Sequence, residues 1–218
     1  MNKPTVKIDV ISDVVCPWCY IGKRRIEKAI SKLNGEISVE LEYHPFELNP
    51  DTPKDGRNQK QYLAAKFGGD EKYDEITNYV TEVAAEEGLH FDYEKQKISP
   101  NTRDAHRIIM SAKAEGKQLA TKEAFMKAYF EDGIDLTKKE NLIAVAVKAG
   151  LDGKKVSEFL DSEEGLAEVV MEEQSYQQRG VRGVPFFIIN NKYGVSGAQS
   201  SETFVKAIRQ VANEMSLA

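Results

Sequence analysis

The feature that most constrains this chain is a Cys-Pro-Trp-Cys turn between a β-rich segment and an amphipathic helix. Cys16 and Cys19 are the only cysteines among the 218 residues. Residues 6–11 lean apolar and are rich in β-branched side chains, which predicts a strand over 6–13, and residues 20–33 carry apolar side chains at helical spacing. Pro17 suits the first helical position, because its φ is already helical and its missing N–H needs no partner there. We therefore expect Cys16 to precede the first turn of a helix directly.

This position predicts a reactive thiol at Cys16. Free N–H groups and the positive end of the helix dipole favour a thiolate, so we expect the pKa of Cys16 to be lowered. Cysteines so placed titrate between about pH 3.5 and 7.5, against about 8.5 for a free cysteine. Cys19, one turn further in, is expected to be more buried and to attack a mixed disulfide formed on Cys16. The motif thus indicates a pair that cycles between dithiol and disulfide.

Three other interpretations of the two cysteines compete with this one. A zinc site needs two more ligands, and only His44, His90 and His106 are available, none of them at zinc-knuckle spacing. A structural disulfide across so short a loop stabilises little, because the stabilisation grows with loop length. Ordinary core cysteines remain an alternative, although packing alone does not call for Pro and Trp between them. We expect no metal site.

Charge and composition limit the classes of partner. The net charge is −5, the pI is about 5.4, and the 30% of charged residues are of mixed sign. Neither a nucleic acid nor a membrane surface is therefore an expected partner. The N-terminal residues show no apolar leader pattern, and no window is long enough to span a bilayer. We expect a soluble, cytoplasmic protein, a compartment in which a lone Cys-x-x-Cys pair is typically catalytic or redox-sensing.

The order of predicted elements is βαβ, many helices, then ββα. Residues 37–43 alternate strictly and predict a second strand, parallel to the first because a βαβ connection joins them. Residues 58–179 show helical periodicity and no convincing strand. We therefore predict an α/β fold in three parts, in which the first half of a sheet domain (1–57) and its second half (180–218) enclose a large all-helical insertion (58–179).

Local signals set several helix and strand ends. The insertion is expected to hold helices at 58–67, 71–87, 101–115, 122–131, 138–149, 153–160 and 166–178. Thr137 followed by Glu140 has the capping-box pattern, which predicts a helix start. Asn190-Asn191 predicts a hairpin turn, and Ser200 is expected to cap a last amphipathic helix.

Four blocks of sequence resemble one known family. They are Ser12 to Lys23 (SDVVCPWCYIGK), Pro45 to Pro50 (PFELNP), Asn101 to Arg107 (NTRDAHR) and Gly183 to Phe187 (GVPFF). In this order they resemble the FrnE-type subfamily of DsbA-like thiol oxidoreductases, which have a thioredoxin fold, and the likeness extends over essentially the whole chain. The resemblance implies a thioredoxin-like βαβ…ββα sheet with a helical insertion.

The resemblance also implies where substrate binds. Pro185 should follow a cis peptide bond beside Cys16, which leaves the Val184 backbone free to pair with an extended substrate. The alternative is an ordinary proline at a strand start. Trp18 and the Phe46 loop should offer apolar surface beside the sulfurs, although Trp18 could instead pack under the helix. The residues expected to bind substrate are Pro17, Trp18, Val184, Pro185 and Gln199.

One departure from the family concerns the proton of Cys19. Thioredoxin-like proteins often bury an acid six residues before the nucleophile, and Val10 stands there in this chain. Asp13, Glu47 or a water could take the proton instead. His106 is interpreted as a buried histidine satisfied by hydrogen bonds and not as a catalytic base.

Three functions follow from these observations. The first is a cytoplasmic thiol-disulfide oxidoreductase or isomerase that acts on thiol- or disulfide-bearing proteins or small molecules, with no bound cofactor and glutathione as a candidate redox partner. The second is a glutathione-dependent isomerase or kappa-class-like transferase, whose members usually have serine at the position of Cys16; Gln199 lies where they hold glutathione. The third is a chaperone-like module in which the thiols are incidental.

Overall fold

The core of the fold is a four-stranded sheet with the strand order β2-β1-β5-β6. The computed structural model describes residues 3–216. The strands are β1 (Thr5–Ser12), β2 (Ser38–Pro45), β5 (Phe186–Ile189) and β6 (Tyr193–Ser196). β1 and β2 pair in parallel, whereas β5 is antiparallel to both β1 and β6. The predicted βαβ and ββα halves are therefore confirmed, and together with the helical block they give the expected thioredoxin-like α/β fold.

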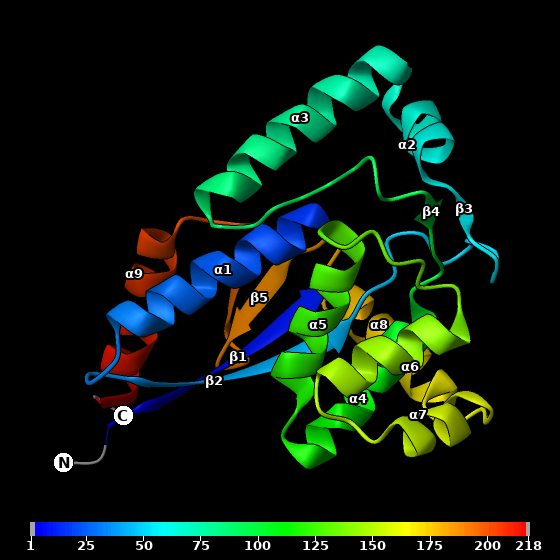
Figure 1. Cartoon of the computed structure of the whole chain (residues 1–218). Coiled ribbons are helices and arrows are strands. Elements are labelled where there is room, and N and C mark those ends of the chain that lie inside the picture. The colour runs from blue at the N-terminus through cyan, green and yellow to red at the C-terminus, as the bar shows by residue number, and fades with distance from the viewer. Residues whose placement is uncertain (1–2, 217–218) are drawn as a thin grey trace.

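Helices cover both faces of this sheet (Figure 1). α1 (Pro17–Lys32) and α9 (Ser201–Ser216) share one face, where Phe187 of β5 meets Phe204 of α9 with ring centroids 4.6 Å apart. On the other face, Tyr176 of α8 (Leu166–Gln178) packs with Ile11 and Ile188. The sheet is thereby buried on both sides, which holds the end of β1 and the start of α1 in a fixed place.

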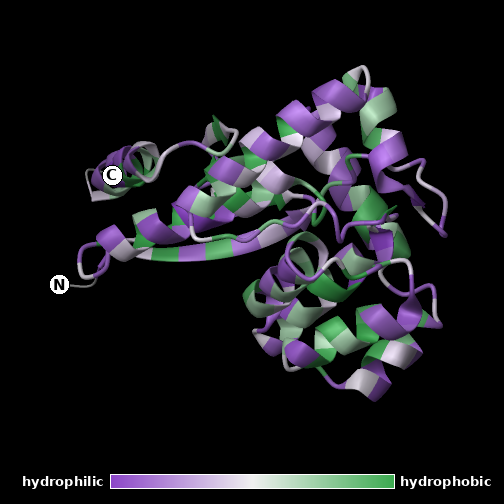
Figure 2. Cartoon of the chain, turned by 45° about the horizontal axis from the view of Figure 1, so that its top comes forward, coloured by the Kyte–Doolittle hydropathy of each residue, from purple (hydrophilic) through white to green (hydrophobic). Residues whose placement is uncertain are grey.

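The chain between β2 and β5 is mostly helical and amphipathic, as the alternating colours of Figure 2 show. Besides α8 it contains α2 (Gln59–Phe67), α3 (Asp70–Glu86), α4 (Arg103–Ser111), the 3-10 turn η1 (Ala112–Glu115), α5 (Gln118–Phe130), α6 (Lys139–Lys148) and α7 (Gly153–Leu160). Its apolar core is continuous with α1, because Tyr20 packs against Phe91 and Phe130. The division into segments 1–57, 58–179 and 180–218 stays a prediction.

The prediction that this insertion is all-helical is wrong in one detail. Two short strands, β3 (Arg57–Asn58) and β4 (Ile98–Ser99), form an antiparallel pair. Each strand has only two residues, too few for alternation to be visible, and the partners are far apart in the sequence. Gly56 allows the close approach: it has φ +75°, and a Cβ there would lie 2.5 Å from Ile98.

The capping box predicted at Thr137 and Glu140 does not form. α6 begins after Lys138, and the Thr137 hydroxyl instead donates a hydrogen bond to Asp135 (2.7 Å). Lys138 is therefore the N-cap residue of α6, and its side chain makes no capping hydrogen bond.

Two other local predictions are confirmed. Asn190 and Asn191 both have positive φ in the hairpin turn, as asparagine tolerates. The Ser200 hydroxyl accepts a hydrogen bond from the Thr203 N–H (3.2 Å) at the start of α9. Among residues 3–216, none of the helices combines the length and the apolarity that a bilayer span requires.

Candidate active site at the start of α1

Both cysteines lie where the sequence places them, at the amino end of α1. Cys16 is the N-cap residue with extended backbone angles (φ −91°, ψ 112°), and Pro17 is the first helical residue. The Cys19 N–H donates to the Cys16 carbonyl (3.0 Å), which closes the first turn. Both are free cysteines, with exposed fractions of only 3% for Cys16 and 2% for Cys19. The helix start therefore holds a reduced pair of buried thiols.

Residues from the far end of the chain meet Cys16. The Val184-Pro185 peptide bond is cis, as the resemblance implied. The Cys16 thiol donates to the Val184 carbonyl (Sγ to O, 3.7 Å), and Pro185 packs beside Gly22, where a Cβ would lie 3.2 Å from its ring. The tertiary structure thus joins Val184 and Pro185 to the Cys-Pro-Trp-Cys turn.

A cavity of about 320 Å³ opens onto Cys16. Its wall includes Pro17, Trp18 and Val184, together with apolar side chains of α2 and α3 such as Leu63, Phe67, Ile76 and Val80. Cys19 does not line it. A substrate sulfur can therefore reach Cys16 but not Cys19, which is the asymmetry that separate attacking and resolving roles require.

Trp18 combines the two roles considered for it. Its side chain is half-buried and packs on Tyr79 of α3, with ring centroids 6.2 Å apart, yet it also lines the cavity. Trp18 is therefore both a packing residue and part of the surface that a substrate would meet.

Two of the residues expected around the sulfurs lie elsewhere. Gln199 is exposed and its side-chain amide donates to the Ser196 carbonyl (2.9 Å), so the loop after β6 holds it outside the cavity wall. The Phe46 loop does offer apolar surface to the cavity, but through Leu48, because Phe46 itself is buried in the apolar cluster with Tyr176. Strand β2 turns the Phe46 side chain toward α8, which the sequence of the loop did not indicate.

The expectation of a lowered pKa at Cys16 is wrong for the reduced pair. The pKa of the Cys16 thiol is raised well above its usual value, first because Cys16 is hydrogen-bonded to Cys19, then because both are buried. A negative charge on Cys19 also opposes a second charge beside it. In this geometry the reduced Cys16 thiol therefore resists ionisation.

Asp13 and Glu47, the two carboxylates considered as proton acceptors, already have partners. Asp13 is fully buried, accepts the Leu48 N–H (2.8 Å) and lies 3.2 Å from Nε2 of His106. Burial raises the pKa of Asp13, but the hydrogen bond and charge of His106 outweigh it and the net pKa is lowered. Glu47 is held by two hydrogen bonds from Arg103 (3.1 and 2.6 Å). The interpretation of His106 as a buried, hydrogen-bonded histidine is confirmed.

Lys122 is a buried cation at the end of β1 that the sequence reasoning missed. It lies on α5 with 1% of its surface exposed, and its ammonium donates to the Ser12 carbonyl (3.2 Å). Burial lowers the pKa of Lys122 to about 8, against the opposing effect of negative charge on Cys19, Asp13 and Cys16. A signal existed in the sequence, because Lys122 is three, four and seven residues before Phe125, Met126 and Tyr129 and so belongs to their apolar face.

Residues 7–209 match the DSBA-like thioredoxin domain family. The chain belongs to this family. A solved structure titled a probable DsbA oxidoreductase, SCO1869 from Streptomyces coelicolor, is 35% identical, with a TM-score of 0.90 over 96% of this chain and 91% of that one.

Two further proteins resemble this DsbA-like chain at lower sequence identity. The uncharacterized protein YwbO of Bacillus subtilis is 29% identical over 94% of this chain and 96% of its own length. The cytosolic disulfide reductase DsbM from Pseudomonas aeruginosa, solved with GSH, has a TM-score of 0.63 at 12% identity, covering 97% of this chain and 98% of that one. The DsbM likeness is one of fold alone.

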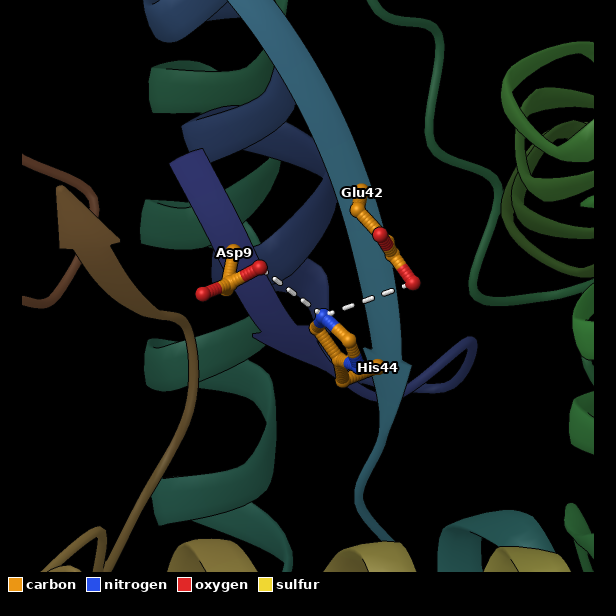
Figure 3. Close-up of side chains that lie close together, drawn as sticks. All are labelled: Asp9, Glu42 and His44. Atoms are coloured by element: carbon orange, nitrogen blue, oxygen red, sulfur yellow. Dashed lines mark hydrogen bonds and ion pairs between the residues drawn. The ribbon is translucent and has the colours of Figure 1, made fainter. Parts of the chain in front are cut away.

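A second titratable cluster of this DsbA-like protein lies around His44, whose ring packs on Tyr176 of α8. Figure 3 shows His44 between Asp9 and Glu42. His44 Nε2 lies 3.2 Å from Asp9 and 4.0 Å from Glu42, and His44 Nδ1 lies 3.1 Å from Glu172. The ligand-type atoms of Asp9, Glu42 and His44 are close enough together to hold a cation, but both carboxylates already face His44, and Lys113 also pairs with Glu42. We interpret the cluster as ion pairs around a protonated histidine, and the absence of a metal site stays a prediction.

The His44 cluster should make stability depend on pH. Burial lowers the pKa of His44, but the hydrogen bonds to Asp9 and Glu172 and their charges outweigh it and raise the pKa to about 9. Because the pKa is raised in the folded state, protonated His44 stabilises the fold. This contribution to the free energy of unfolding is complete below the pKa of an unfolded histidine, about 6.5, and is lost as pH rises through about 9. We expect a loss on the order of 1–3 kcal/mol, reduced by the partial exposure of Glu172.

The measurement is urea unfolding at pH 6 and pH 9.5 for the wild type and His44→Gln. Other groups titrate in the same interval, so the relevant quantity is the difference in free energy of unfolding between the wild type and His44→Gln. This difference should be large at pH 6 and shrink toward pH 9.5. A difference that does not change with pH would contradict the assignment.

Proposed function

We propose that this chain is a cytoplasmic, FrnE-type thiol-disulfide oxidoreductase or isomerase in which Cys16 attacks and Cys19 resolves. The observation that carries the proposal is the arrangement at the start of α1, where Cys16 lines a cavity and Cys19 lies one turn behind it, outside the cavity wall. The cytoplasmic assignment is supported by the use of cysteine, since the only two in the chain form this one motif.

The proposed reaction passes two electrons between the pair and a substrate disulfide. The Cys16 thiolate attacks one substrate sulfur, which forms a mixed disulfide and releases the other substrate sulfur as a thiolate. Cys19 then loses its proton and attacks the Cys16 sulfur, which releases the second substrate thiolate and leaves a Cys16–Cys19 disulfide. The reverse sequence oxidises a substrate dithiol. If a different thiolate of the same substrate attacks the mixed disulfide instead of Cys19, a new substrate disulfide forms, the Cys16 thiolate is released, and the substrate disulfide has been isomerised.

Substrate contacts follow from the cavity. Trp18 and Pro17 would meet apolar groups beside the substrate sulfur, and the Val184 backbone next to Pro185 would pair with an extended main chain. Glutathione is our candidate small redox partner, and the GSH-bound DsbM structure of the same fold supports it. Gln199 would take part only for a ligand that extends beyond the cavity onto the loop after β6.

The proposal predicts that Cys19→Ser becomes trapped on its substrate. With the resolving thiol removed, a mixed disulfide on Cys16 has no intramolecular route to release. Incubation with oxidised glutathione or a disulfide-bonded peptide should therefore give a stable adduct, measured by intact-protein mass spectrometry and reversed by a reducing agent.

The matched control is Cys16→Ser, which leaves Cys19 as the only thiol of the chain. Because Cys19 does not line the cavity, adduct formation should be far slower in this variant. Equal rates for the two variants would show that the assigned roles of nucleophile and resolving cysteine are wrong.

A further inference from the structure

The wall of the Cys16 cavity contains two buried side-chain amides, each with one atom that lacks a partner. Gln59 of α2 is fully buried, and its Oε1 accepts the Tyr73 hydroxyl (2.9 Å), but its Nε2 donates to no atom of the described chain. Gln96, 3% exposed, donates from Nε2 to the Phe130 carbonyl (3.4 Å), but its Oε1 accepts from no described donor. Both residues line the cavity, so its wall holds one unused donor and one unused acceptor.

These two atoms call for a partner from outside the chain. A buried donor or acceptor that is left without a hydrogen bond costs free energy, so such atoms are few in folded proteins. Turning either amide over would only exchange which of its two polar atoms lacks a partner. A guest that carries both a carbonyl and an N–H, as an amide group does, would satisfy Gln59 and Gln96 together.

The rest of the wall sets the charge and size of that guest. Lys66 of α2 is the charged residue that lines the cavity, and within the part of the chain that the structure describes no carboxylate lines it. The Lys66 ammonium is exposed and donates to the neutral Asn49 Oδ1 (3.0 Å), so it can attract an anionic group. The volume of about 320 Å³ is at the small end of the range for small-molecule sites, about 300–1,000 Å³. The cavity therefore suits a small acidic molecule.

We propose that the cavity selects small disulfides built like short peptides, in which an amide group pairs with Gln59 and Gln96 and a carboxylate meets Lys66. This inference rests on the proposed function, because Cys16 must react with the sulfur that the cavity holds beside it. The Cys16 thiolate bonds to one sulfur of the guest, the S–S bond of the guest breaks, and the other half leaves as a thiolate that takes a proton from water. Gln59, Gln96 and Lys66 take no part in these bond changes and determine which disulfide is held.

The test uses the Cys19→Ser variant, in which each disulfide should leave one adduct on Cys16. Its rate of formation is measured by intact-protein mass spectrometry with three probes. Oxidised glutathione carries amides and carboxylates, dithiodipropionate carries carboxylates only, and bis(hydroxyethyl) disulfide carries neither. Because the probes differ in intrinsic reactivity, the rate of each probe with a further variant is divided by its rate with Cys19→Ser alone.

Adding Gln59→Leu or Gln96→Leu should slow the glutathione reaction about threefold to tenfold more than the reactions of the other two probes, since one hydrogen bond to the amide is lost. A general disturbance of the wall would slow all three probes alike. So would a wall in which water alone completes the two amides. Equal slowing of the three probes, or no slowing, in both variants would overturn the assignment of the amide site.

Adding Lys66→Met should slow both carboxylate-bearing probes about twofold to fivefold relative to bis(hydroxyethyl) disulfide, a modest factor because the ammonium is exposed. The matched control is Lys72→Met, which removes the same charge from an exposed lysine of α3 outside the cavity wall. It should produce no such selectivity. The same selectivity in both lysine variants would reduce the effect to net charge and overturn the role of Lys66.

A second measurement needs no substitution in the wall, so it also covers variants that fail to fold. S-methylglutathione keeps the amides and carboxylates of glutathione but cannot form a disulfide. It should slow the reaction of bis(hydroxyethyl) disulfide with Cys19→Ser, whereas methylthioethanol at the same concentration should not. Equal effects of the two competitors would contradict recognition of the amide and carboxylate groups.

Failure of the inference and failure of the proposed function give different results. A Cys19→Ser protein that forms no adduct with any of the three probes contradicts the function. Adducts with all three probes, at relative rates that do not respond to the wall variants, contradict only the selectivity of the cavity.

Discussion

Replacing Cys16 with serine is expected to lower disulfide exchange by about three orders of magnitude or more, to the uncatalysed rate. A serine hydroxyl at this position has no adjacent base and is a far weaker nucleophile toward a disulfide sulfur than a thiol is. The substitution replaces one sulfur atom by oxygen, so the fold and the cavity should be unaffected. The measurement is the rate of insulin reduction with glutathione as electron donor.

The same variant separates the proposed function from its alternative. Glutathione-dependent isomerases of related architecture usually use serine at this position, so an isomerisation or conjugation activity that survives in Cys16→Ser would favour that reading. Full insulin reduction by Cys16→Ser would rule out the dithiol mechanism. Cys19→Ser is the matched comparison, because it keeps the attacking thiol and removes only the resolving one.

Truncating Phe130 to alanine is expected to destabilise the protein by about 3–5 kcal/mol. Phe130 is 1% exposed, stacks on Phe91 (4.5 Å) and packs against Tyr20 of α1 (6.1 Å). It therefore ties the helical insertion to the helix that bears the cysteines. Loss of the ring removes buried apolar area and leaves a cavity that the surrounding aromatic side chains cannot fill. Urea unfolding of the reduced protein measures the change.

Tyr79→Ala is the matched control for this prediction. Tyr79 is also an aromatic residue of the insertion, but 58% of its surface is exposed, so its truncation should cost little. A Phe130→Ala protein as stable as Tyr79→Ala would show that the packing of Phe130 on α1 does not hold the two parts of the chain together.

Local patterns were sufficient for most of the secondary structure. The periodicity after Pro17 predicted α1, and Asn190-Asn191 predicted the hairpin, because in each case the cause lies within a few residues of the effect. The β3–β4 pair was missed for the opposite reason, because a two-residue strand has no pattern of its own and its partner is distant in the sequence. The Thr137 hydroxyl was misassigned because α6 has Lys138 as its N-cap, one residue later than the capping-box pattern placed it.

The sequence by itself determined that Cys16 and Cys19 lie at the amino end of a helix, behind a strand, in a thioredoxin-like fold. The tertiary structure decided the chemistry of that turn: it raised the pKa of Cys16, kept Gln199 away from the cavity and brought Lys122 from α5 to the end of β1. The physical reason is that a helix start is specified by neighbouring residues. Burial and the charges that surround a buried group are set by segments distant in the sequence.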